Sequence, residues 1–229
     1  MVMSSPLILA LDFEPERALA LAKNLDPEQC KLKVGSMLFT SSGPSIISSL
    51  KDLGFDIFLD LKFHDIPNTV YAAVQEACKL NVWMVNVHCS GGLEMLKSAR
   101  KSISDYKTET PPLLVGVTML TSLSEDEGKK IGVSDIRKQI TLLTKLAKSS
   151  GLDGVVCSPL EVKEIKNSFG TEFITVTPGI RSSLLEDQKR VASASKALKS
   201  GSDYLVVGRP ITESNNPVES VKSFLKEIN

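Results

Sequence analysis

Short apolar runs recur along the chain and form its most regular pattern. Eight of them have the length and the β-branched content of strands buried in a parallel sheet. The expected strands are Pro6 to Asp12, Lys31 to Gly35, Ile57 to Lys62, Met84 to Cys89, Pro112 to Leu120, Gly154 to Ser158, Phe173 to Ile180 and Tyr204 to Ile211. Amphipathic stretches separate these runs, so the pattern predicts a β-α unit repeated eight times.

Residues that favour helix ends lie between the expected strands. Pro15 and Pro44 suit first helical turns, and Ser134 suits the N-cap of a later helix. Glycines that suit the carboxyl ends of helices stand at Gly54, Gly151 and Gly201. These signals agree with the alternation of strands and helices.

Eight alternations in 229 residues favour the α/β class and a single (β/α)8 TIM barrel, with residues 1–229 forming one domain. A doubly wound open sheet would also alternate, but it normally carries a Gly-rich nucleotide-binding turn after its first strand. Here Asp12 is followed by FEPERA, which holds no such turn. The connection from Leu120 to Ser134 is long, irregular and polar, which suggests a mobile cover over a site.

Charge and cysteine content exclude several classes of protein. Lys plus Arg and Asp plus Glu both number 27, so no overall basic field would hold a polymeric nucleic acid. The four cysteines form no C-x-x-C pair, and the first residues do not read as a signal peptide. The longest apolar runs are far shorter than a membrane span. We expect a cytoplasmic protein with reduced thiols and no membrane partner.

Charged and polar side chains gather where the expected strands end, which is where barrels carry their catalytic residues. They are Asp12, Lys31, Lys33, Asp60, Lys62, Asn86, His88, Gly208 and Arg209. Because side chains alternate across a strand, Asp60 and Lys62 project to one face, and Lys31 and Lys33 do the same. A lysine within an apolar run must be paired or must face a polar cavity. The set therefore predicts a charged active site.

Two of the aspartates have a structural alternative, because aspartate is a good N-cap residue. Asp12 is a candidate cap for the helix that begins near Pro15. Asp65 is a candidate cap for the helix that begins near Pro67, where Asn68 competes for the same position.

The histidines and cysteines suggest little chemistry. His64 and His88 have no carboxylate or thiolate partner at metal-ligand spacing, and we favour structural hydrogen bonding for His88. Cys89 and Cys157 lie in apolar strands, which is typical of core residues.

Two motifs near the end of the chain indicate a phosphate site. TPGIR, from Thr177 to Arg181, closes the seventh expected strand, and VVGRPI closes the eighth with Gly208 and Arg209. Barrels often bind phosphate between the loops that follow these two strands, where backbone N–H groups converge and an arginine binds two oxygens. Gly-Arg-Pro alone would also suit a simple turn, but its place in the eighth unit favours a phosphate ester as substrate.

The segment DLKFHDIPNT, from Asp60 to Thr69, closely resembles the catalytic segment of the bacterial-type orotidine 5'-phosphate decarboxylase family. Supporting motifs follow the family order over almost the whole chain. They are ALD (10–12), KVG (33–35), MLTS (119–122), TPGIR (177–181), DQKRV (187–191) and VGRPIT (207–212).

The resemblance implies a metal-free and cofactor-free conversion of orotidine 5'-phosphate to UMP and CO2 in pyrimidine biosynthesis. It implies that Lys62 is the proton donor, within a charge array completed by Lys33, Asp60 and Asp65. The implied substrate contacts are Asp12 and Thr69 at the ribose, Thr121 and Ser122 at the base, Pro178, and Arg181, Gln188, Gly208 and Arg209 at the phosphate. The family also implies a homodimer in which Asp65, Ile66 and Thr69 reach the neighbouring site.

Two other functions remain as alternatives. Mg²⁺-dependent sugar-phosphate decarboxylases or aldolases of the same superfamily resemble this chain in a D-x-K-x-x-D core, but they carry a metal-binding glutamate where this chain has Lys33. A lysine there would repel a cation. A non-catalytic nucleotide-binding barrel would have little reason to hold Lys62 between carboxylates, and an assay with orotidine 5'-phosphate separates it from an enzyme.

Overall fold

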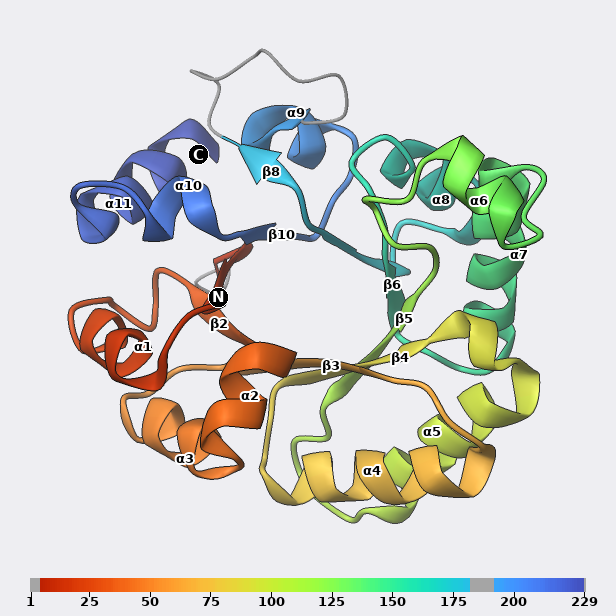
Figure 1. The fold of residues 1–229 in the computed structure, drawn as a ribbon, viewed down its shortest axis with the longest axis horizontal. Helices are drawn as coiled ribbons and strands as arrows, with labels where there is room; N and C mark the ends of the chain where they lie inside the picture. The colour runs from red at the N-terminus through yellow and green to blue at the C-terminus, as the bar shows by residue number, and fades with distance from the viewer. Residues whose placement is uncertain (1–4, 182–191, 229) are drawn as a thin grey trace.

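Eight parallel strands close into a barrel in the computed structural model, which describes residues 5–181 and 192–228. Around the ring they follow the order β1, β2, β3, β4, β5, β6, β7 and β10 (Figure 1). Their bounds are β1 Leu7–Ala10, β2 Lys31–Gly35, β3 Ile57–Phe63, β4 Met84–His88, β5 Leu113–Val117, β6 Gly154–Val156, β7 Ile174–Thr177 and β10 Tyr204–Val207. The closed barrel expected from the sequence is confirmed.

Helices surround the ring of strands, as Figure 1 shows. They are α1 Pro15–Ala22, α2 Ser36–Ser42, α3 Ser45–Asp52, α4 Pro67–Lys79, the 3-10 turn η1 Cys89–Gly91, α5 Leu93–Asp105, α6 Glu125–Lys130, α7 Ile136–Ser149, α8 Val162–Phe169, α9 Ala194–Lys199, α10 Arg209–Thr212 and α11 Pro217–Ile228. Two further short strands, β8 (Ile180–Arg181) and β9 (Ala192–Ser193), pair in parallel between β7 and α9. Within the described ranges, no helix is both long and apolar enough to cross a membrane.

Several strands end earlier than their apolar runs. β1 ends at Ala10 although the run continues through Leu11, and β10 ends at Val207 although the run continues to Ile211. Leu11 and Ile211 are buried against the core without belonging to a strand. The apolar pattern extends past the strand ends because these residues are buried, Leu11 just after β1 and Ile211 in α10.

Helix ends follow the sequence signals with two exceptions. Pro15 is the first residue of α1, but Pro44 lies in the N-cap position just before α3. The expected N-cap at Ser134 is wrong, because Asp135 caps α7 by accepting a hydrogen bond from the Lys138 amide at 3.0 Å. The three glycines expected at carboxyl ends all have left-handed backbones there: Gly54, Gly151 and Gly201.

The polar connection after β5 is not irregular throughout, because it contains α6. The Ser124 hydroxyl accepts a hydrogen bond from the Glu127 amide, and the Glu127 carboxylate accepts one from the Ser124 amide. This reciprocal capping box stabilises a helix as short as α6. The mobility expected for this connection stays a prediction.

Inward and outward side chains alternate along each barrel strand and build two apolar layers. Outward residues such as Leu59 pack beneath the helices, whereas inward residues fill the barrel. The inward set is Ile8, Ala10, Phe58, Met84, Val115, Val117, Val156, Val176 and Val206. Phe58 and Asp60 lie on the same face of β3, so the alternation that fills the barrel also directs the carboxylate to its mouth.

Candidate active site

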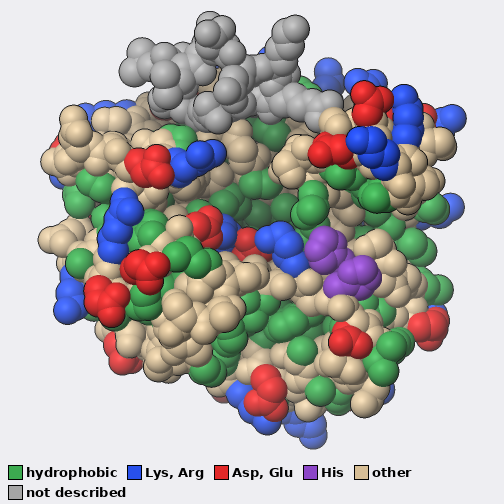
Figure 2. Space-filling view, in the orientation of Figure 1, with side chains coloured by type: hydrophobic (Ala, Val, Ile, Leu, Met, Phe, Trp, Pro, Cys, Tyr) green, Lys and Arg blue, Asp and Glu red, His purple; other side chains and the backbone are tan. Residues whose placement is uncertain are grey.

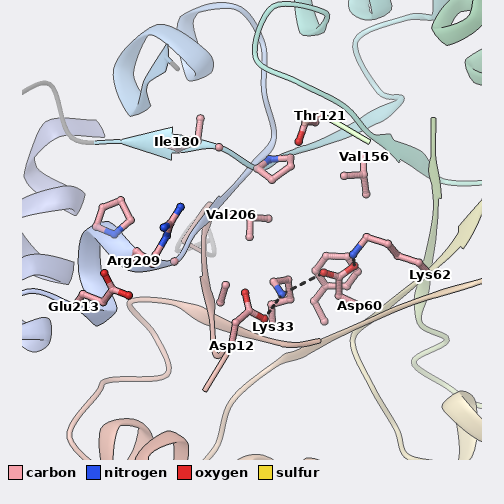
Figure 3. A pocket seen from close by; sticks show the side chains of 16 residues that line it. Asp12, Lys33, Asp60, Lys62, Thr121, Val156, Ile180, Val206, Arg209 and Glu213 are labelled. Carbon is pink, nitrogen blue, oxygen red and sulfur yellow. Dashed lines mark hydrogen bonds and ion pairs between the residues drawn. The ribbon is translucent and has the colours of Figure 1, made fainter. Parts of the chain in front are cut away.

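A chain of alternating charges lies at the carboxyl ends of β1, β2 and β3 (Figure 3). Lys33 Nζ lies 2.9 Å from Asp12 Oδ1 and 3.2 Å from Asp60 Oδ2. Lys62 Nζ lies 2.7 Å from Asp60 Oδ1. The Lys33 and Asp60 side chains are only 9% and 10% exposed, whereas that of Lys62 is 35% exposed. Buried charges of this kind must be paired, and the pairing leaves Lys62 the most accessible of the three.

Asp12 belongs to this array and not to a helix end. Its Oδ1 accepts a hydrogen bond from Lys33 Nζ, while Glu14 occupies the N-cap position of α1 without a side-chain cap bond. The helix-capping alternative for Asp12 is therefore wrong. Gly35 makes room for the pair, since a Cβ atom there would lie 2.9 Å from Asp12 Oδ1 and 3.1 Å from Lys33 Nζ. The sequence held the KVG motif but gave no sign of this steric requirement.

A cavity of about 670 Å³ opens beside the array. Figure 2 shows the hollow near the middle of the face, with acidic and basic side chains along it and the histidines next to it. Eight residues that the sequence analysis singled out line the cavity: Asp12, Lys33, Asp60, Lys62, Thr121, Pro178, Gly208 and Arg209. Arg209 lies across the cavity from Lys62 (Figure 3). A substrate can therefore contact a cationic group at each end.

Uncharged residues and one unexpected acid complete the cavity wall. Ala10, Phe58, Val156 and Val206 supply apolar surface, to which the planar face of an aromatic ring could pack. Glu213 lines the wall near Arg209 and was not singled out from the sequence (Figure 3). It follows α10 in a polar segment whose composition gave no indication that it faces a site.

Four of the expected residues do not line this cavity in their own chain: Asp65, Ile66, Thr69 and Ser122. Asp65 is exposed on the segment that leaves β3, where its carboxylate accepts a hydrogen bond from the Ile66 amide at 2.6 Å. Ile66 itself holds the N-cap position of α4 and makes no side-chain cap bond, so neither Asp65 nor Asn68 caps this helix. A single chain thus brings together three of the four expected catalytic residues.

Two expected phosphate contacts, Gln188 and the side chain of Arg181, lie outside the described part of the structure. Gln188 lies outside the described residues 5–181 and 192–228. Arg181 ends the short strand β8 and directly follows Pro178, Gly179 and Ile180, which line the cavity; its side chain is not described.

The two histidines form a pair beside the array instead of a metal site. Their rings lie 5.3 Å apart at 39°. Burial lowers the pKa of His88, and the nearby His64 and Lys62 lower it further, so the His88 ring is neutral at neutral pH. Among the described residues, no three His, Cys, Asp or Glu side chains are grouped to hold a metal ion.

The cysteines are core residues, as expected for Cys89 and Cys157. All four cysteines are free and buried. Burial raises the pKa of Cys30 and of Cys89 to about 12, so these thiols stay protonated and unreactive at neutral pH.

The fold and the cavity together define a class of enzyme. Lysines and aspartates at the mouth of a (β/α)8 barrel, with an arginine on the loop after the last strand, are typical of a TIM-barrel enzyme that acts on a phosphorylated substrate. The chain belongs to the orotidine 5'-phosphate decarboxylase / HUMPS family, whose model matches residues 5–224.

Similar proteins span the same length as this chain. Orotidine 5'-phosphate decarboxylase of Dichelobacter nodosus is 52% identical, over 98% of this chain and 99% of the relative. That of Pseudoalteromonas translucida is 49% identical, over 98% and 97% respectively. The crystal structure of orotidine 5'-phosphate decarboxylase from Lactobacillus acidophilus superimposes with a TM-score of 0.87 at 38% identity, covering 98% of this chain and 99% of that one.

Proposed function

We propose that this chain, as a single catalytic domain, decarboxylates orotidine 5'-phosphate to UMP and CO2 without a metal ion or cofactor. The observation that carries the proposal is the buried Lys33–Asp60–Lys62 array, which faces a cavity with Arg209 on its opposite side. Family membership and full-length identity to named decarboxylases support the same reaction. This reaction forms UMP, the product of the pyrimidine biosynthetic route.

The chemistry requires stabilisation of an electron pair that the pyrimidine ring cannot delocalise. The bond between C6 and the carboxylate breaks, CO2 leaves, and the electron pair remains at C6. The Lys62 ammonium stabilises this charge and then donates its proton to C6, and solvent returns a proton to the lysine. Such electrostatic stabilisation is far stronger in a closed, dry cavity than in water.

Asp60 serves this step by holding both lysines. Its two carboxylate oxygens lie within 2.7 Å of Lys62 Nζ and 3.2 Å of Lys33 Nζ. A carboxylate at this distance attracts both ammonium groups and fixes the direction of Lys62. Asp65, supplied by a second copy of the chain, would stand near the departing carboxylate, and the repulsion between them is relieved as CO2 leaves.

The remaining contacts in this proposal are those that the family resemblance implies. Arg209 and the backbone of Gly208 bind the phosphate, together with Arg181 and Gln188. Asp12 and Thr69 bind the ribose, whereas Thr121, Ser122 and Pro178 border the base. Phosphate binding remote from C6 supplies energy that closes the loops over the reacting carbon and raises the rate of the chemical step.

The active unit in this proposal is a homodimer with shared sites. Asp65 and Ile66 are exposed between β3 and α4, and Thr69 is exposed in the first turn of α4. Ile66 is 67% exposed, and two further exposed apolar residues, Met37 and Leu93, stand on the adjacent segments after β2 and β4. Exposed apolar side chains suit a contact with a second copy of the chain, and two-fold symmetry would present each Asp65 to the opposite cavity.

The proposed location is the cytoplasm. All four cysteines are free thiols, which is the state that a reducing compartment maintains. Polymeric nucleic acid is not a partner in this proposal, since positive and negative residues balance at 27 each.

The proposal is tested by following the ultraviolet absorbance of orotidine 5'-phosphate with purified protein in EDTA. We expect complete conversion to UMP at the same rate as without chelator, because the two lysines occupy the oxygens of Asp60 that a divalent ion would need. Loss of activity in EDTA with recovery on adding Mg²⁺ would favour the metal-dependent sugar-phosphate enzymes instead. Absence of turnover under both conditions would contradict the decarboxylase assignment.

Replacing Arg209 should separate phosphorylated from unphosphorylated ligands. In Arg209→Ala we expect the affinity for UMP and the kcat/KM for orotidine 5'-phosphate to fall by about 10- to 100-fold, because charge-assisted hydrogen bonds to the phosphate are lost. The affinity for uridine, measured by the same titration, should change little. Arg137→Ala, which removes an exposed arginine of α7 outside the cavity, is the matched control. Equal losses for UMP and uridine would remove Arg209 from the phosphate site.

A further inference from the structure

Asn86 connects two members of the charge array through a single side chain. It lies on β4 with none of its surface exposed. Its Nδ2 group donates a hydrogen bond to Asp60 Oδ1 at 2.7 Å, and its Oδ1 accepts one from the backbone amide of Lys62 at 2.8 Å. Both ends of the amide are therefore committed to the segment that carries the reacting lysine.

The backbone of Lys62 needs this support. Its φ is +53°, in the left-handed region that residues with a Cβ atom rarely adopt. The pairing of β3 with β4 shifts register between Leu59 and Phe63, so the regular ladder is interrupted here. The Asn86 side chain takes the place of a ladder carbonyl and satisfies the Lys62 N–H, which would otherwise lack a partner at a partly buried position.

The same side chain restrains the Asp60 carboxylate. Asp60 Oδ1 receives Lys62 Nζ and Asn86 Nδ2, each at 2.7 Å, while Oδ2 faces Lys33. Asn86 thus supplies the uncharged donor that keeps this carboxylate from turning toward one lysine alone. Asparagine suits the position because its amide donates and accepts at once without adding a charge to the array.

We propose that Asn86 is a positioning residue for decarboxylation: it fixes the Asp60 carboxylate and the Lys62 backbone so that the ammonium group is directed at C6. The inference rests on the proposed function. It assigns Asn86 no contact with substrate, since the residue does not line the cavity. Its loss should therefore lower kcat, while binding of the product, which depends on the ribose and phosphate contacts, stays almost unchanged.

Asn86→Asp is the sharpest test, because it keeps the shape and the acceptor for the Lys62 amide but replaces the donor. When ionised, the new carboxylate repels Asp60; when protonated, its O–H group donates to Asp60 as the amide did. We expect kcat to fall by about 10- to 100-fold at pH 8, and the ratio of variant to wild-type kcat to rise as the pH falls. Lys33, Lys62 and His88 lie near Asp60 in both proteins, so any pH dependence that the two proteins share cancels in this ratio.

Two further variants keep the test decisive. Asn86→Gln retains donor and acceptor but displaces them by one methylene, so it should lower kcat and leave UMP affinity within about threefold of wild type. Ser102→Ala is the matched control. Ser102 lies on α5, does not line the cavity and is as buried as Asn86; its hydroxyl donates a hydrogen bond to the Tyr71 carbonyl of α4 at 2.7 Å. It should lower the Tm without changing kcat. UMP titration counts the folded sites in every sample.

The outcomes separate the inference from the proposed function. If the wild-type protein does not turn over orotidine 5'-phosphate, the proposed function itself is wrong. The positioning role alone is overturned if the wild type is active and the kcat of Asn86→Asp equals the wild-type kcat. It is also overturned if the ratio of the two kcat values does not vary with pH. A parallel loss of kcat and UMP affinity in Asn86→Gln would also overturn it, because it would mark Asn86 as a general support of the cavity.

Discussion

Lys62→Ala is expected to lose nearly all turnover while still binding UMP. Removing the ammonium group takes away both the stabilisation of charge at C6 and the proton that C6 receives, so kcat should fall by about 10³-fold or more. Arg209, the proposed phosphate contact, lies across the cavity from Lys62, so the Kd for UMP should stay within about tenfold of wild type. Steady-state kinetics and calorimetric titration of UMP measure the two quantities.

The matched control for this variant is Lys101→Ala. Lys101 lies on α5, is largely exposed and pairs with Asp105 one helical turn away, so its loss should leave both quantities unchanged. Near-normal turnover in Lys62→Ala would refute the proton-donor role. A loss of UMP affinity as large as the loss of kcat would show instead that Lys62 mainly supports the shape of the cavity.

Mixing two inactive homodimers should restore activity if the sites are shared. Lys62→Ala and Asp65→Ala should each be nearly inactive, because neither homodimer assembles an intact array. In a hybrid dimer, one site collects both defects, while the other takes Lys62 from one chain and Asp65 from its partner. Random re-association of equal amounts makes about half of the dimers hybrid with one good site of two, so about a quarter of wild-type activity should return.

The same experiment has a clear contrary outcome. If Asp65 served the cavity of its own chain, every site in every mixture would lack one member of the array, and mixing would restore nothing. Mixing Lys62→Ala with Asp60→Asn is the control, because both residues line the same cavity of one chain, where Lys62 Nζ lies 2.7 Å from Asp60 Oδ1. That mixture should stay inactive.

Much of the fold and part of the site follow from the sequence because both depend on local periodicity. Eight apolar runs separated by helical stretches predict the barrel, and the two-residue period of a strand directs Asp60 and Lys62 to one face. Parallel strands in a closed barrel bring their carboxyl ends together, so Asp12 and Lys33 from other strands join the same array.

Features that depend on strand register or on empty space could not be predicted from the sequence. Asn86 could be assigned to its strand from the sequence, but its bonds to Asp60 and Lys62 occur where the β3–β4 pairing shifts register, which no sequence period encodes. The room that Gly35 leaves for Asp12 depends on where two side chains meet in space. Asp65 lies outside the cavity of its own chain, and its contribution to the cavity of a second copy stays a prediction.

The central claim is that the array breaks the bond between C6 and the carboxylate by electrostatics alone. The most direct measurement is a single turnover with enzyme in excess over orotidine 5'-phosphate labelled with ¹³C in its carboxyl group, in metal-free buffer with chelator. We expect wild type to release labelled CO2 and UMP in equal amounts, and Lys62→Ala to bind the substrate and return it unchanged over the same period. Equal release of labelled CO2 by both proteins, or recovery of intact substrate from wild type, would contradict the claim.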